Sequence, residues 1–121
     1  MGKRNALGKM GEDIAAQFLE QQNFTIRARN WRYKRAELDI IAMDDKTMVF
    51  VEVKTRSDDM VGRPQDAVDT RKRGQLIKAA IAYMHESKHE WIIRFDIVGI
   101  VVKNNVPYID HIRDAFFPSL A

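Results

Sequence analysis

Two acidic residues and a lysine interrupt two strongly apolar stretches of the sequence. Asp39 lies within residues 37–42, and Glu52 and Lys54 lie within residues 49–54. Side chains alternate between the two faces of a β-strand, so Glu52 and Lys54 share a face and lie about 6.6–6.8 Å apart. Two carboxylates and an ammonium group set among apolar residues indicate a site that handles phosphate through a divalent cation.

The two stretches predict a β-hairpin whose register follows from its apolar residues. With the turn centred between Asp45 and Lys46, the apolar residues of both strands fall on one face, which favours this register. A slip by two residues would preserve the faces and stays open. The predicted opposing pairs are Asp39 with Glu52, Glu37 with Lys54, and Ile41 with Phe50. The predicted apolar face consists of Leu38, Ile40, Ala42, Val49, Val51 and Val53.

In this register Asp39 and Glu52 are opposed carboxylates, which repel each other unless a positive charge lies between them. Mg²⁺ prefers hard oxygen ligands and keeps several water molecules, so it could bridge both carboxylates and a scissile phosphate. Lys54 would then contact the attacking water or stabilise charge on the phosphate in the transition state. The alternative from the residues alone is a set of surface ion pairs, Glu37 with Lys54 and Glu52 with an arginine.

Positive charge is concentrated near the N-terminus of a chain whose net charge is +3. Residues 1–35 contain eight basic and three acidic residues, whereas the other 86 contain 12 basic and 14 acidic residues. Cations bind phosphates and aromatic rings stack on bases, which favours nucleic acid as the partner; a solvated strand and turn is the alternative. The candidate nucleic-acid-binding residues are Arg27, Arg29, Arg32, Lys34 and Arg35, and, in a later helix, Arg71.

The spacing of apolar residues predicts a helix, three strands, a helix and two strands. This order is typical of an α/β fold in which helices flank a central sheet. Asn23 is predicted to end the first helix, and residues 103–105 are predicted to form a turn. The predicted helices span residues 5–22 and 70–87, with 66 as an alternative start of the second, and the predicted strands span residues 24–27, 37–43, 48–54, 91–102 and 106–112.

Length and composition predict one soluble globular domain over residues 1–121. Because the chain has no cysteine, a disulfide framework, a thiol nucleophile and a cysteine-ligated zinc site are excluded. Residues 97–102 form the longest apolar run, whereas a membrane span needs about 20 residues. The N-terminal region also lacks the apolar stretch of a signal peptide. We therefore expect a cytoplasmic protein with no membrane partner.

Four motifs along the chain are specific in combination. They are Gly11-Glu12, Glu37-Leu38-Asp39-Ile40-Ile41, Val49-Phe50-Val51-Glu52-Val53-Lys54-Thr55-Arg56 and Ala67-Val68-Asp69. They resemble the YraN-like family of small, largely uncharacterised bacterial proteins, and through it the restriction-endonuclease-like PD-(D/E)XK superfamily. The resemblance covers nearly the whole chain. It implies a restriction-endonuclease-like fold, with a central mixed β-sheet flanked by α-helices, and a nuclease site that uses Mg²⁺ or Mn²⁺.

The resemblance also implies roles for individual residues. Asp39 and Glu52 would hold the metal, Glu12 would complete its shell, and Lys54 would match the lysine of the motif. By the same resemblance, side chains of the second helix would reach a phosphate or a water molecule in the site, with a solvated polar face as the alternative. These side chains are Lys72 and Gln75.

Two positions depart from the superfamily pattern: Leu38 replaces its proline, and Ala36 stands where relatives commonly have glycine. Because the superfamily includes inactive members, a catalytically silent nucleic-acid-binding or adaptor protein is the alternative function. The predicted substrate is DNA, branched DNA included, and symmetric cleavage of a four-way junction would require a homodimer. Asp96, inside an apolar strand, is predicted to be a buried, hydrogen-bonded acid and is a second-tier candidate.

Overall fold

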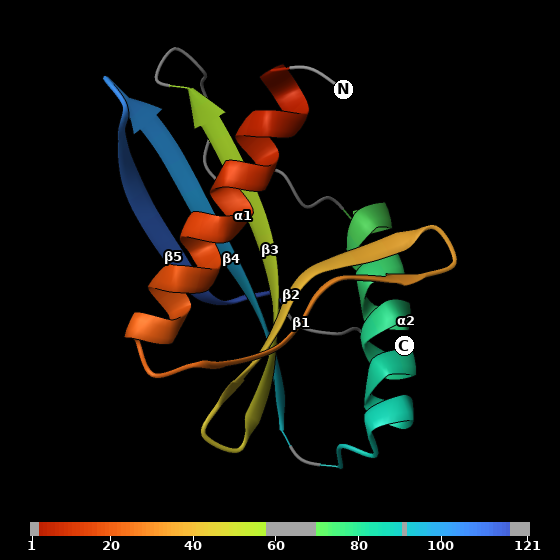
Figure 1. Ribbon diagram of the computed structural model, residues 1–121. Coiled ribbons are helices and arrows are strands. Elements are labelled where there is room, and N and C mark those ends of the chain that lie inside the picture. The colour runs from red at the N-terminus through yellow and green to blue at the C-terminus, as the bar shows by residue number, and fades with distance from the viewer. Residues whose placement is uncertain (1–2, 58–69, 91, 117–121) are drawn as a thin grey trace.

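The computed structural model describes residues 3–57, 70–90 and 92–116, without the side chains of residues 3–5 (Figure 1). The predicted α/β fold and its element order are confirmed. The Ala67-Val68-Asp69 motif lies outside the described residues. The elements are α1 (Lys3–Gln21), β1 (Thr25–Tyr33), β2 (Ala36–Asp44), β3 (Thr47–Ser57), α2 (Thr70–Ser87), β4 (Ile93–Lys103) and β5 (Val106–Phe116).

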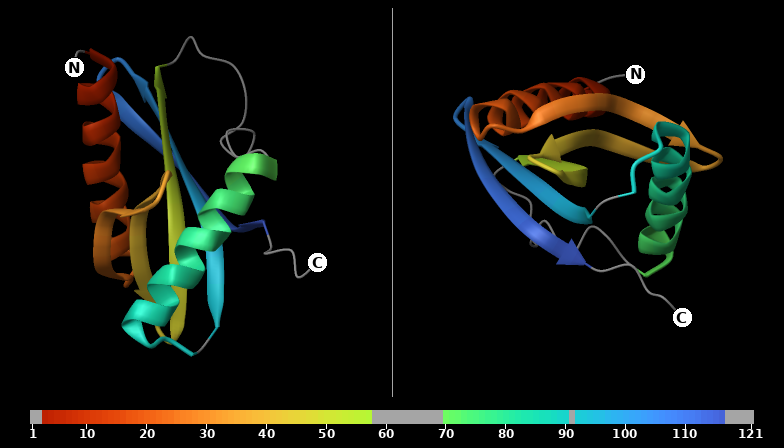
Figure 2. Two further views of the ribbon diagram at one scale, coloured as in Figure 1. Left: turned by 90° about the vertical axis from the view of Figure 1, so that its right-hand side faces the viewer. Right: turned by 90° about the horizontal axis from the view of Figure 1, so that it is seen from below.

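The five strands form one mixed sheet in the order β1-β2-β3-β4-β5. The β3–β4 pair is parallel, and the other three neighbouring pairs are antiparallel. A parallel pair needs a crossover connection, and α2 lies in this connection between β3 and β4. The two helices lie on opposite sides of the sheet, as the two views of Figure 2 show.

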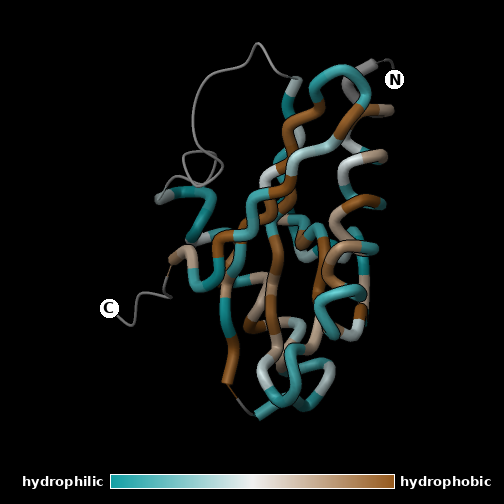
Figure 3. The backbone as a smooth tube through the Cα atoms, turned by 90° about the vertical axis from the view of Figure 1, so that its left-hand side faces the viewer, coloured by the Kyte–Doolittle hydropathy of each residue, from teal (hydrophilic) through white to brown (hydrophobic). Residues whose placement is uncertain are grey.

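Each helix covers its own hydrophobic cluster on the sheet. Under α1, Leu19 packs with the sheet residues Ile40 and Val98. Under α2, Leu76 packs with Phe50, and the aromatic rings of Phe50 and Phe95 lie 5.4 Å apart. Hydrophobic stretches follow the strands, whereas hydrophilic residues gather in the turns (Figure 3). Burial on both faces explains why β3 and β4 are apolar at consecutive positions.

The predicted register of the β2–β3 hairpin is confirmed from Asp44 and Thr47 to Ile40 and Val51. In this stretch Ile41 lies opposite Phe50, as the pairing of apolar residues requires. The ladder ends there, one step before the predicted opposition of Asp39 and Glu52. Beyond Ile40, the β1–β2 hairpin bends away from β3 and extends towards α2 (Figure 1).

The bend corrects the predicted face of Leu38. Strand alternation predicts that Leu38 shares a face with Ile40 and Ala42, but it packs in the cluster under α2 with Leu76. Asn30, in the paired strand β1, has a left-handed φ of 53°, a conformation that asparagine tolerates better than most residues. The alternation of side chains along β2 is therefore interrupted between Leu38 and Ile40. Leu38 faces α2, whereas Ile40 and Ala42 face α1.

Asparagine residues also end other elements as predicted. Asn23, with a φ of 71°, is the second residue after the end of α1, and Phe24 donates its backbone N–H to the carbonyl of Leu19. Asn104 and Asn105 both have positive φ in the turn between β4 and β5. β1 is longer than predicted because residues 28–33 pair with β2. In the part of the chain that the structure describes, neither helix has the length and hydropathy of a membrane span.

Candidate active site

Asp39 lies where β2 and β3 separate. Beyond the end of the ladder, its Oδ2 accepts a hydrogen bond of 2.8 Å from the backbone N–H of Val53. Burial is the main cause that raises the pKa of Asp39 to about 8, the nearby carboxylate of Glu52 raises it further, and the Val53 N–H opposes the rise. This carboxyl group therefore holds its proton at neutral pH unless a cation stabilises the charged form.

Three carboxyl groups from α1 and β2, hereafter the acidic cluster, converge at this point. Glu12, Glu37 and Asp39 each contribute an oxygen that lies within 4.8 Å of the other two. The Oε1 of Glu12 is buried and has no hydrogen-bond partner among the described residues, and the guanidinium of Arg29 lies 3.9 Å from it, within ion-pair but not hydrogen-bond distance. Burial raises the pKa of Glu12, although Asn30 and the guanidinium of Arg29 oppose the rise. Converging carboxylates with an unsatisfied buried oxygen fit a hard divalent cation such as Mg²⁺ or Mn²⁺.

Gly11 allows α1 to bring Glu12 to the cluster. A Cβ atom at position 11 would overlap Oγ1 of Thr55 and lie 2.8 Å from its Cβ, closer than real Cβ atoms approach. The backbone of α1 thus packs directly against β3 at the residue that precedes Glu12. The motif Gly11-Glu12 joins a close helix–strand contact to an acidic side chain.

Glu52 lies on the α2 side of the same site, where it pairs with Lys72. The Nζ of Lys72 lies 2.6 Å from the Oε1 of Glu52, whose residue is only 9% exposed. Glu52 is not a member of the acidic cluster, but it lines one pocket of about 240 Å³ together with two of its members, Glu37 and Asp39. This pocket, hereafter the carboxylate pocket, is lined by Arg35, Ala36, Glu37, Asp39, Glu52, Lys72, Gln75 and Leu76. The structure therefore places Lys72 and Gln75 on the wall of this pocket, and their contact with a phosphate or a water molecule stays a prediction.

Lys54 follows Glu52 on β3 and is half-buried. By the alternation of the strand it shares the face of Glu52, but it is not among the residues that line the pocket. Within the described ranges, Lys54 forms no ion pair with Glu37, its predicted neighbour. Because the ladder ends at Ile40, the hairpin carries Glu37 away from the expected position opposite Lys54.

Sequence reasoning missed Glu37 as a member of the acidic cluster. Glu37 is half-buried, and its Oε2 lies 2.9 Å from the guanidinium of Arg32 in the paired strand. The available signal was the spacing, since Glu37 lies two residues before Asp39 and shares its face in an extended strand. The same alternation predicts that Glu37 lies opposite Lys54, but the β2–β3 ladder does not reach Glu37.

The basic residues of the hairpin fall into two groups. Arg29 lies 2.7 Å from Asp13 and 3.9 Å from Glu12, and Arg32 pairs with Glu37, so both support the acidic side chains. The other group is exposed and, within the described ranges, forms no ion pair. It consists of Arg27, Lys34 and Arg35, with Arg71 in the first turn of α2.

Asp96 is fully buried in β4 with a complete set of partners. It accepts hydrogen bonds of 2.8 and 3.0 Å from Arg94 and one of 3.0 Å from the backbone N–H of Asp114, and His111 lies 2.8 Å away. Burial alone would raise the pKa of Asp96, but the hydrogen bonds from His111, Arg94 and Asp114 lower it below its usual range. These contacts confirm the predicted buried acid and account for its charge without a ligand.

The sequence is similar to known bacterial proteins over nearly its whole length. The model of the uncharacterised protein family UPF0102 matches residues 11–100. A UPF0102 protein of Bacteroides thetaiotaomicron is 43% identical over 120 residues, which cover 99% of both chains. A UPF0102 protein of Flavobacterium johnsoniae is 46% identical over 97% of this chain and 98% of its own, and one of Geotalea daltonii is 46% identical over 91% and 88%. These matches confirm the resemblance to a family of uncharacterised bacterial proteins.

Proposed function

The chain belongs to the uncharacterised protein family UPF0102, and we propose that it is a metal-dependent nuclease that hydrolyses phosphodiester bonds in DNA. The observation that carries this proposal is the acidic cluster, in which carboxylate oxygens of Glu12, Glu37 and Asp39 converge. One oxygen of this cluster, Oε1 of Glu12, is buried and lacks a hydrogen-bond partner among the described residues. Three acids at one point are costly to charge together, and a bound divalent cation removes that cost.

The acidic cluster would hold Mg²⁺ or Mn²⁺, with Glu52 as a further ligand. When bound, the ion would supply Lewis acidity to the phosphate and generate a nucleophilic hydroxide from water. Burial raises the pKa of Asp39 and favours its protonated form, and Asp39 would give up this proton when the ion binds, because the ion stabilises the charged form. Lys54, on the face of Glu52, would stabilise the negative charge that develops on the phosphate.

The exposed cations of the hairpin support nucleic acid as the substrate. Lys34 and Arg35 lie at its end, and Arg35 also borders the carboxylate pocket. Each cation that contacts a phosphate releases a counterion, so the affinity for DNA should fall as salt rises. Replacing Lys34 and Arg35 by glutamine should weaken DNA binding and reduce its salt dependence. An unchanged salt slope would show that neither side chain contacts a phosphate.

Lys54→Ala tests the catalytic assignment. We expect turnover to fall by roughly 10²–10³-fold, the usual loss when one donor to a developing negative charge is removed. The affinity for DNA should change much less, because the other cations remain. Lys46→Ala, in the exposed turn between β2 and β3, is the matched control. An equal loss of turnover and affinity in Lys54→Ala would contradict this role.

A catalytically silent nucleic-acid-binding protein is the second candidate, and the Lys72–Glu52 ion pair favours it. The ammonium group compensates the charge of Glu52 without a metal ion, as a retained but unused site would require. Thermal unfolding with and without Mn²⁺ distinguishes the two functions. The nuclease predicts a higher melting temperature with Mn²⁺ that is lost in Asp39→Asn, and the silent protein predicts no change in either.

A further inference from the structure

Two further hollows continue from the carboxylate pocket along the groove between the end of the β1–β2 hairpin and α2. The first has a volume of about 230 Å³ and shares Arg35, Ala36 and Gln75 with the carboxylate pocket. The second has a volume of about 700 Å³ and shares Tyr33, Lys34 and Lys78 with the first. Because neighbouring hollows share lining residues, the three lie in succession, hereafter the hairpin track, from Glu37 and Asp39 of the acidic cluster to Trp31.

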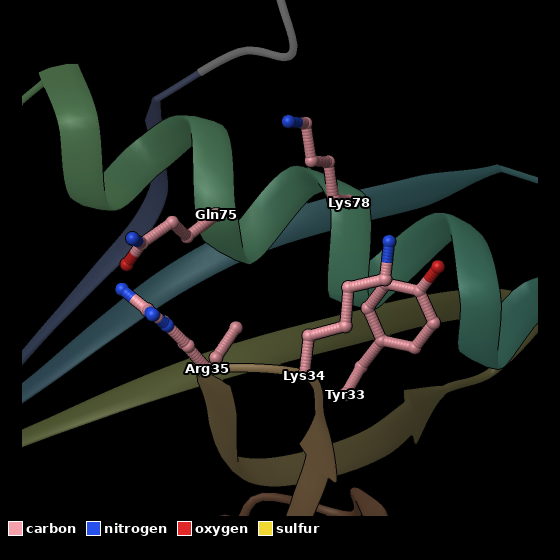
Figure 4. A pocket seen from close by; sticks show the side chains of 6 residues that line it. Tyr33, Lys34, Arg35, Gln75 and Lys78 are labelled. Atoms are coloured by element: carbon pink, nitrogen blue, oxygen red, sulfur yellow. The ribbon is translucent and has the colours of Figure 1, made fainter.

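Cations border the hairpin track along its length. In the part nearest the cluster, Arg35 and Gln75 point towards one another, and Lys34 lies beside the ring of Tyr33 (Figure 4). Lys34, Arg35 and Lys78 are exposed and, within the described ranges, form no ion pair with an acidic side chain. The acidic Glu86 lines only the hollow farthest from the cluster. A path with this charge favours a ligand that carries negative charge at repeated intervals.

The track also presents aromatic rings. Trp31 and Tyr33 lie on β1 with their ring planes 3° from parallel and their centroids 6.5 Å apart, and the ring of Tyr83 packs edge-on against Trp31. Both rings of β1 are half-buried and border the hollows of the track, and Nζ of Lys34 lies 5.4 Å from the centroid of Tyr33, so a cation and a ring lie side by side there. An acidic peptide would use the cations alone, whereas a nucleotide strand uses both, its phosphates with the cations and its bases with the rings.

We propose that the hairpin track binds an unpaired polynucleotide strand and leads it to the acidic cluster. This inference rests on the proposed nuclease function and specifies its substrate as nucleic acid that is single-stranded next to the site. In a duplex, base faces are covered by neighbouring base pairs, and side chains stack on them only when the bases leave the helix. Tyr33 and Trp31 therefore contact bases of an unpaired strand, while Lys34, Arg35 and Lys78 contact its phosphates.

The test measures binding in the presence of a chelator, so that cleavage does not interfere. Fluorescent single-stranded DNA and RNA oligonucleotides and a blunt DNA duplex of the same length are titrated with the full chain. The double variant Lys34→Gln/Lys78→Gln is compared with Lys46→Gln/Lys103→Gln, which removes two exposed cations outside the track. We expect the single strand to bind more tightly than the duplex, and the track variant to bind it about tenfold more weakly than the control.

Stacking is tested separately at Tyr33. Tyr33→Leu removes the aromatic face and should weaken single-strand binding about tenfold, whereas Tyr33→Phe keeps the ring and should bind like the unchanged protein. Melting temperatures establish whether each variant is folded. If Tyr33→Leu is unfolded, the comparison of the two lysine double variants still tests the proposal. Equal binding by both lysine double variants, or tighter binding of the duplex, would overturn the proposal, as would equal binding by folded Tyr33→Leu and Tyr33→Phe.

Cleavage with Mn²⁺ separates this inference from the proposed function. If single-strand binding depends on the track but no substrate is cleaved, the proposed role of the track is supported and the proposed nuclease function is contradicted. Metal-dependent cleavage of an intact duplex at the same rate in both lysine double variants would retain the nuclease and overturn the track.

Discussion

The Nζ of Lys72 lies 2.6 Å from the Oε1 of Glu52. This ion pair joins the first turn of α2 to the centre of β3. This contact takes place on the wall of the pocket that Glu52 shares with Asp39 and Glu37. An ammonium group here supplies the positive charge that a metal ion would bring. Lys72 and a metal ion are therefore expected to compete for the carboxylate of Glu52.

Lys72→Gln should bind Mn²⁺ about tenfold more tightly than the unchanged protein, because a positive charge is removed from the site while its acids remain. Isothermal titration calorimetry measures this affinity directly. Lys72→Arg keeps the charge and should bind Mn²⁺ no more tightly than lysine does. Lys78→Gln, on the same helix but not on the carboxylate pocket, controls for the change in net charge. Weaker Mn²⁺ binding in Lys72→Gln would show that Lys72 supports the metal site rather than competing for it.

Metal binding should strengthen as the pH rises towards about 8. Asp39 has a pKa of about 8 in the folded protein, chiefly because it is buried, and a metal ion binds only its charged form. The affinity for Mn²⁺ should therefore rise by up to about tenfold per pH unit between about pH 6 and 8 and change little above that. Titrations at pH 6, 7, 8 and 9 measure the slope. In Asp39→Asn the affinity should be low and nearly independent of pH over this range, and a flat profile in the unchanged protein would contradict the assignment.

The same raised pKa predicts the effect of Asp39 on stability. In the unfolded chain Asp39 loses its proton near pH 4, whereas in the folded protein it keeps it to about pH 8. Between these values the folded state binds more protons, so this residue makes the free energy of unfolding fall as the pH rises. Asp39→Asn should remove that fall, and its stability relative to the unchanged protein should be higher at pH 8 than at pH 5. Urea denaturation without metal at both pH values tests this difference.

Gly11→Ala should destabilise the protein by about 1–3 kcal/mol, because the added methyl group overlaps Thr55 and forces α1 away from β3. Gly8→Ala is the matched change in the same helix, where a Cβ meets no atom within 4 Å. It should stabilise the protein by up to about 1 kcal/mol through helix propensity. Urea denaturation gives both values. If the two variants changed stability by the same amount and sign, the close contact between Gly11 and Thr55 would be ruled out.

Asp96→Asn should destabilise the protein by about 3 kcal/mol at pH 7, because it removes the buried charge that faces Arg94 and His111. Asp110→Asn, at an exposed position of β5, should have little effect. The pKa of Asp96 is lowered in the folded state, so its contribution is present above about pH 4 and is lost as the pH falls through the folded value. The stability difference between the unchanged protein and Asp96→Asn should therefore shrink below pH 4, and a constant difference would contradict this assignment.

The elements and the central register could be predicted from local patterns. The apolar residues of β2 and β3 allowed few registers, and the predicted pairing of Ile41 with Phe50 is confirmed. Asn23 and the Asn104-Asn105 pair marked the end of α1 and the last turn, because asparagine accepts positive φ. These predictions needed only residues that are close in sequence.

The face of Leu38 and the partners of the acidic residues could not be predicted in this way. Alternation along a strand assumes a continuous ladder, but β2 pairs with β3 only from Ile40 onwards, and Asn30 in the paired strand β1 has a left-handed φ. The pairing of Lys72 with Glu52 depends on the packing of α2 across the sheet, which no spacing in the sequence encodes. The roles of Asp39, Glu52, Lys54 and Glu12 in metal binding and catalysis stay predictions.

Cleavage of labelled nucleic acids tests the central claim most directly. The panel contains linear duplex, flap, four-way-junction and single-stranded DNA and single-stranded RNA, each with Mg²⁺, Mn²⁺ or a chelator. Folded Asp39→Asn and Glu52→Gln serve as site variants, and Asp110→Asn serves as the exposed control. We predict cleavage that requires metal, favours substrates with an unpaired strand, persists in Asp110→Asn and is lost in both site variants. Binding without cleavage of any substrate, equal in the unchanged protein and both site variants, would contradict the nuclease and favour the silent nucleic-acid-binding protein.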